Sequence, residues 1–89
     1  MPDDRLRSAS EALREASATA DDAEIQRRLY DLSDRIAALA AGDGEPDGDD
    51  LMQQLHALGD LREATGGDVS EQVDDALETV RERREELEG

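Results

Sequence analysis

The large apolar residues recur at helical spacing in four separate stretches of the chain. In the clearest stretch every step between them is three or four residues: Ile25, Leu29, Leu32, Ile36 and Leu39. This spacing places the side chains on one face of an α-helix. Asp21 with Glu24 has the pattern of a capping box, and Gly42 is a typical residue just after a helix. We therefore predict a helix at about residues 22–41.

The stretch before this helix repeats the spacing with smaller side chains: Leu6, Ala9, Leu13, Ala16 and Ala20. It predicts a helix at about residues 4–20, with Pro2 or the Asp3–Asp4 pair near its start. From Ala20 to Ile25 the stripe skips five residues, which fits either a break at Asp21–Asp22 or a bulge in one long helix. We favour the break.

Turn-forming and charged residues fill positions 43–49, and this acidic segment is predicted to be a linker. A third helix follows at about residues 50–65, with a capping box of Asp50 and Gln53. Its stripe consists of Leu51, Leu55, Leu58 and Leu61. The pair Gly66–Gly67 ends this helix.

The fourth predicted helix spans about residues 69–88 and is capped by Asp68 with Glu71. Its apolar face consists of Val69, Val73, Ala76, Leu77, Val80 and Leu87. No stretch of the sequence has the sustained alternation of a β-strand. The predicted fold is therefore all-α, a small antiparallel bundle in one domain, residues 1–89. It has four helices, or three where the first two are continuous.

Composition makes this prediction depend on the solvent. The chain has 25 Asp and Glu residues, a formal net charge of -15, and only 16 Leu, Ile and Val residues among 89. Bulk composition alone predicts disorder, but four helical stripes favour a folded bundle. All ten basic residues are Arg, and an acidic, Lys-free chain is typical of salt-loving archaea. At about 1 M salt the Debye length is roughly 3 Å, so surface carboxylates repel weakly. We expect a compact protein at molar salt and a largely unfolded one in dilute buffer.

The predicted core is thin, and two chains that share a core would bury more apolar surface. We therefore predict a homodimer. Tyr30, Met52 and His56 are the largest groups flanking the stripes. Because aromatic and Met side chains are enriched at interfaces, these three are interface candidates. The alternative is that they cover the edges of the bundle's own core.

The acidic segment contains one pattern that suits a cation. Asp43, Glu45 and Asp47 occupy positions one, three and five of a helix–loop–helix calcium loop. The match then fails, because position twelve is Gln54 in place of a bidentate Glu, and Pro46 interrupts the loop. A cation-binding module at residues 43–50 is an alternative function, and a solvated linker is the favoured interpretation.

Catalysis has little support in the sequence. His56 is the single His and the only side chain suited to act as a general base near neutral pH. The chain has no Cys, and one His without a nucleophile motif or a second ligand makes no catalytic site. We predict that the protein is not an enzyme and uses no cofactor.

Arg81, Arg83 and Arg84, together with Arg27–Arg28, are the candidates for nucleic-acid phosphate contacts. Glu residues stand at helical spacing from the C-terminal Arg residues, and aromatic residues for base stacking are missing there. A salt-bridged, solvated face is therefore the favoured interpretation. Association with DNA is a further alternative.

The N-terminus is acidic, and no apolar run approaches the ~20 residues of a membrane span. We expect a cytoplasmic protein without membrane contact. Three segments carry a resemblance to known proteins: the pattern from Leu6 to Ala16, the Gly-Asp-Gly-Glu-Pro-Asp segment at 42–47, and the run from Val73 to Arg81.

In these segments the chain resembles a family of short, uncharacterised, acidic helical-bundle proteins of haloarchaea. The resemblance implies a helical bundle in a salty cytoplasm and brings no activity or site residues with it. From the apolar helix faces we predict a binding function, either self-association or association with an unidentified protein partner.

Overall fold

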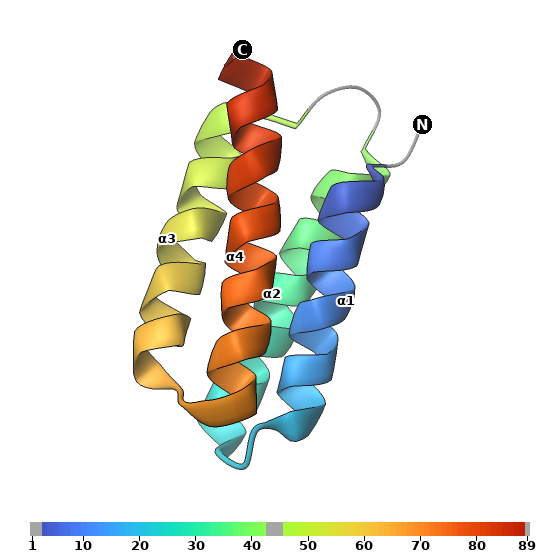
Figure 1. Cartoon of the computed structure of the whole chain (residues 1–89). Coiled ribbons are helices and arrows are strands. Elements are labelled where there is room, and N and C mark those ends of the chain that lie inside the picture. The colour runs from blue at the N-terminus through green and yellow to red at the C-terminus, as the bar shows by residue number, and fades with distance from the viewer. Residues whose placement is uncertain (1–2, 43–45, 89) are drawn as a thin grey trace.

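A computed structural model describes residues 3–42 and 46–88 of the chain. In these residues it has four α-helices: α1 (Asp4–Thr19), α2 (Ala23–Ala41), α3 (Gly48–Ala64) and α4 (Gly67–Glu88). Successive helices run in opposite directions, so the chain forms an antiparallel up-and-down bundle (Figure 1). The predicted small all-α bundle of four helices is confirmed.

The break between α1 and α2 lies where the apolar stripe skips. Ala20 leaves the helix with extended backbone, at φ -67° and ψ 137°. Asp22 then begins α2, because its carboxylate accepts hydrogen bonds from the N–H groups of Glu24 (2.8 Å) and Ile25 (3.3 Å). These N–H groups have no partner inside the helix, so a capping carboxylate sets where the helix starts. In the turn, Gln26 Nε2 donates to the carbonyl oxygen of Ala20.

α3 and α4 each begin two residues before their predicted starts. Asp47 caps α3 in place of Asp50, since its carboxylate accepts from the N–H of Asp49 at 2.9 Å. Residues 48–49 therefore belong to the helix, and the predicted linker is shorter. Asp50 lies in the first turn, where a negative charge suits the helix dipole. α4 begins at Gly67, whose φ of 62° is in the left-handed region that glycine adopts without strain.

The apolar stripes meet along the axis of the bundle. Every member of the predicted α1 stripe is buried. The other helices add Leu29, Leu32, Ile36, Ala40, Leu51, Leu58, Leu61, Val73, Ala76 and Val80 to the core. Stripe members at the margins are only partly buried: Ile25, Leu39, Leu55, Val69, Leu77 and Leu87. Within residues 3–42 and 46–88, none of the helices has the length and apolar character of a membrane span.

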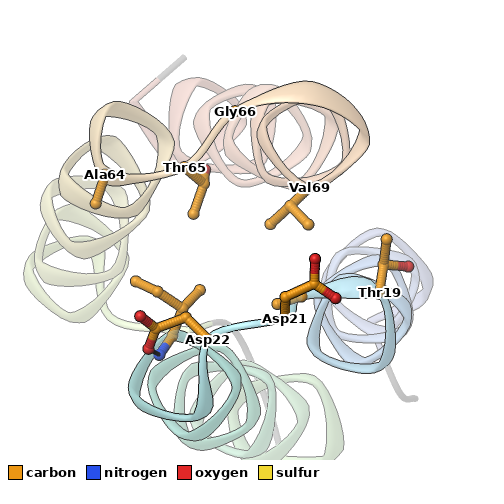
Figure 2. Close-up of a pocket in the computed structure, with 9 residues that line it drawn as sticks. Thr19, Asp21, Asp22, Ala64, Thr65, Gly66 and Val69 are labelled. Atoms are coloured by element: carbon orange, nitrogen blue, oxygen red, sulfur yellow. Dashed lines mark hydrogen bonds between the residues drawn. The ribbon is translucent and has the colours of Figure 1, made fainter.

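The four sides of the bundle are not equally closed. α1 packs closely against both α2 and α4, and α3 packs against α4, but α2 and α3 make few contacts. Small side chains explain the close approach of α1, because its core face includes Ala9, Ala16 and Ala20. The view along the bundle in Figure 2 places the helices around a ring in the order α1, α2, α3, α4. We call the side between α2 and α3 the open side.

The assigned core face predicts different costs for two leucines of the same stripe. Leu58 is fully buried, so Leu58→Ala should lower the free energy of unfolding by about 2–5 kcal/mol. Leu55 lies at the margin of the core, and Leu55→Ala should cost about 1 kcal/mol. Urea denaturation followed by circular dichroism, in molar KCl, measures both changes. Equal losses would contradict the assigned face of α3.

Candidate functional site

The open side forms a groove between α2 and α3. A cavity of about 170 Å³ lies in it, lined by Arg28, Asp31, Leu32, Arg35, Ala57 and Leu61. Leu32 and Leu61 belong to the core and form an apolar floor. Arg28 and Arg35 are exposed and lie seven residues apart, which places them two turns apart on one face of α2. The groove thus has an apolar floor and a cationic rim on α2.

The two cations on this rim have no acidic partner within the described residues. Asp31 lies one turn from both Arg28 and Arg35 but pairs with neither. By contrast, Arg residues of the other helices do pair: Arg5 with Glu86, Arg7 with Glu11, Arg14 with Asp34, Arg62 with Asp74, Arg81 with Glu78 and Arg83 with Asp3. The α2 rim therefore carries two cations without an ion pair and one carboxylate, Asp31, between them, which leaves a formal excess of one positive charge.

Ala57 and Leu61 are the α3 residues that line the groove, and helical spacing places two carboxylates beside them, which we call the α3 rim. Asp50 lies two turns before Ala57 on the same face of α3, and Asp60 lies one turn after Ala57. Both carboxylates are exposed, and neither forms an ion pair in the described part of the chain. The open side thus carries opposite charges on its two rims.

A second cavity, of about 250 Å³, lies at the end of the bundle where both helix-to-helix turns meet. Figure 2 shows Asp21 and Asp22 on one side of the opening and Thr65 and Val69 on the other. The Thr65 hydroxyl donates to the carbonyl oxygen of Leu61 at 2.8 Å, and Asp22 caps α2. Thr65 and Asp22, two of the polar residues that line this cavity, therefore form hydrogen bonds with the ends of the surrounding helices.

The predicted interface residues do not form one surface. Tyr30 is 49% exposed on α2, and the guanidinium carbon of Arg14 on α1 lies 5.7 Å from the centre of its ring, within cation–π distance. Met52 is partly buried and His56 is exposed, one turn apart on α3. Tyr30 therefore faces α1, away from the open side. An interface role for these three residues stays a prediction.

The predicted cation loop is described only in part, because Asp43 and Glu45 lie outside the described residues. Asp47 uses its carboxylate as the cap of α3. Gln54, at the position of the twelfth loop residue, is buried in α3. In residues 3–42 and 46–88 no three His, Cys, Asp or Glu side chains gather as a metal site would require. Cation binding stays a prediction.

Arg83, one of the predicted nucleic-acid candidates, instead connects the end of α4 to the start of α1. Its Nε donates to Oδ2 of Asp3 at 2.5 Å, and the two side chains are only 17% and 14% exposed. Asp3 also caps α1 by accepting from the N–H of Leu6 at 3.1 Å, and its own N–H donates to the carbonyl oxygen of Ala40 at 2.9 Å. Asp3 therefore joins α1, α2 and α4.

The other two candidates also interact within the chain. Arg81 lies 3.8 Å from the carboxylate of Glu78, one turn away on α4. Arg84 is partly buried and makes an intramolecular interaction as well. These contacts agree with the salt-bridged face favoured by the sequence. DNA association stays a prediction.

The environment of Asp3 changes its pKa. Burial by itself raises the pKa, because it disfavours the charged form. Hydrogen bonds from Arg83 and from the N–H of Leu6, with the positive charge of Arg83, outweigh burial and hold the pKa below its ordinary value of 3.8. Asp3 is therefore ionised at neutral pH, as both the cap and the ion pair require.

Asp3→Asn retains a capping oxygen but removes the charge, and it should lower the free energy of unfolding at neutral pH by about 1 kcal/mol. Because the folded-state pKa is the lower one, this contribution is complete above pH 3.8 and is lost as the pH falls through the folded value. The difference from wild type should close over that acidic range. Urea denaturation at a series of pH values tests it.

Asp4→Asn is the matched control, since Asp4 is exposed in the same first turn of α1. It should change the free energy of unfolding less than Asp3→Asn does. A difference between wild type and Asp3→Asn that stays constant down to pH 2 would contradict the role of the Asp3 charge.

Sequence reasoning missed the rims of the open side. The signal was present for α2, because Arg28 and Arg35 flank Leu32 at spacings of four and three residues. It was hidden among many other charges, and no local pattern tells which of them lack a partner. The Asp3–Arg83 pair had no sequence signal, because its members are 80 positions apart.

Comparisons with known proteins identify the family to which the chain belongs. No curated protein and no solved structure matches the chain. The sequence profile of one family matches residues 1–86, which is nearly the whole chain. The chain therefore belongs to the Family of unknown function (DUF7553).

Proposed function

We propose that the protein acts by binding, without catalysis, and that it associates first with a second copy of itself through apolar helix faces. The observation that carries the proposal is the open side. There the apolar floor of Leu32 and Leu61 lies between two helices that make few contacts with each other. Leu32 and Leu61 are already buried within the bundle. A second chain would therefore remove from water mainly the partly buried Ala57 and the apolar stems of Arg28 and Arg35 around this floor.

The margins of the core support the same proposal. Leu39 on α2 and Leu55 on α3 are only partly buried. On α1 the core face combines two leucines with the small residues Ala9, Ser10 and Ala16, which bury little area. A second chain would supply the apolar contacts that a thin bundle lacks, and short helical bundles commonly associate for this reason. An unidentified protein partner that covers the same side is the other form of this proposal.

The proposal places the dimer in the cytoplasm of a high-salt cell. The net charge of -15 and the use of Arg alone as the basic residue support this placement. In dilute buffer the repulsion among carboxylates opposes compact and dimeric states. At about 1 M salt the Debye length is roughly 3 Å, so only charges in direct contact still interact strongly. Salts that are excluded from the protein surface also strengthen the burial of apolar groups.

Sedimentation velocity in molar KCl tests self-association. The expected result is a species of about twice the chain mass that dissociates on dilution. A monomer at every concentration up to the millimolar range would refute the homodimer.

Circular dichroism across a KCl titration tests the high-salt setting. Helicity is expected to rise with KCl and to reach its full value near molar salt, because screening relieves the repulsion among 25 acidic residues. NaCl should act like KCl if screening is the cause. Full helicity in dilute buffer would count against the proposed setting.

A further inference from the structure

We infer that the open side is complementary to itself, and that two copies pair through it about a two-fold axis parallel to the helices. In this arrangement α2 of each copy packs against α3 of the other. The inference rests on the proposed self-association. It adds the face that is used, the relative orientation of the copies and the residue pairs that fix it.

The charges on the rims select this orientation. The α2 rim carries Arg28 and Arg35, the α3 rim carries Asp50 and Asp60, and none of the four has an ion-pair partner in the described part of the chain. A two-fold axis parallel to the helices places each cationic rim opposite an acidic one. An axis across the helices would place α2 against α2 and α3 against α3, and like charges facing each other are costly.

The residues also lie at matching levels along the bundle. α2 and α3 are antiparallel, and one cavity touches Arg28 and Leu32 on α2 and both Ala57 and Leu61 on α3. Arg28 therefore lies at the level of the residues next to Leu61, which include Asp60. The two-fold axis brings Arg28 of one copy beside Asp60 of the other. Arg35 lies two turns nearer the other end of α2, in the direction of Asp50 on α3.

The centre of the face suits close packing. Ala57 is small and lies between the two rims, next to the apolar floor of Leu32 and Leu61, so a partner helix can approach without displacing a long side chain. The molecule extends 36 × 20 × 16 Å between its Cα atoms, and a standard interface takes roughly 800 Å² from each partner. One long face, 36 × 20 Å between Cα atoms, is of this order. Apolar residues at the centre with charges at the rim are the usual anatomy of an interface.

A second copy also fits the open side better than other occupants do. An acidic helix from another protein would attract Arg28 and Arg35 but would meet Asp50 and Asp60 on the other rim. The phosphates of a nucleic acid would meet the same carboxylates. A partner needs acids opposite α2 and bases opposite α3, and this chain itself has that pattern.

A charge-swap experiment tests the inference. One variant, R28D/R35D, makes both rims acidic, and the other, D50R/D60R, makes both rims basic. Each variant alone would place like charges opposite each other, and its self-association should weaken about tenfold or more. An equimolar mixture restores opposite charges at both contacts and should sediment as a dimer. The lowest KCl concentration that preserves full helicity is the best condition, because salt screens rim charges.

Net charge alone predicts a different result. D50R/D60R is less negative than wild type by four charges and R28D/R35D is more negative by four. General repulsion would therefore make D50R/D60R the best self-associating species and would give the mixture no advantage. That result would overturn the inference. A control pair, R7D/R27D and D75R/E82R, changes charge equally at exposed positions away from the groove and should show no preference for the mixture.

A second pair of variants covers the case in which the charge swaps do not fold. Ala57→Arg places a long side chain at the centre of the groove and should give a folded monomer. Ala18→Arg is its matched control on the exposed face of α1 and should remain a dimer. If wild type is a dimer and Ala57→Arg is one as well, the open side is not the interface although self-association stands. If wild type is a monomer, the proposed self-association and this inference both fail.

Discussion

The alanine face of α1 is the constraint on which the rest of the bundle depends. Ala9, Ala16 and Ala20 are buried without long side chains, so α2 and α4 both pack closely against α1. α3 then packs on α4 and is left with few contacts to α2. Leu32 and Leu61 reach the core from either side of this gap and become the floor of a groove. The bundle is therefore closely packed on three sides and open on the side between α2 and α3.

Carboxylates have a structural role in this acidic chain besides solvation. Asp3, Asp22 and Asp47 cap the first three helices, and each accepts a hydrogen bond from a backbone N–H that the helix leaves without a partner. Asp3 goes further, because its pair with Arg83 and its backbone contact with Ala40 hold three helices together at one end. These contacts involve adjacent atoms, so salt screens them less than it screens the repulsion between distant surface charges.

The Arg residues of the bundle differ in whether they form ion pairs within the chain. On α1, α3 and α4, six Arg side chains pair with carboxylates of the same or a neighbouring helix. On α2, Arg28 and Arg35 border a groove with an apolar floor and have no ion-pair partner among residues 3–42 and 46–88. A surface with an apolar floor and rims of opposite charge is chemically suited to protein contact. The proposed self-association rests on this surface, because membership of a family of unknown function assigns no site to the chain.

The sequence by itself determined the helices, because each stripe, cap and glycine acts on residues only a few positions away. The break at Asp22, the buried face of α1 and the end of α2 at Gly42 all depend on such local contacts. The start of α3 was misplaced by two residues, since any of Asp47, Asp49 and Asp50 can cap a helix. The start of α4 was misplaced by two residues as well, because Gly67 begins the helix with a positive φ. Only the tertiary structure decided which sides of the bundle close, which Arg residues find partners and where the groove lies. Those outcomes depend on how whole helix faces fit together, and residues far apart in the chain set that fit.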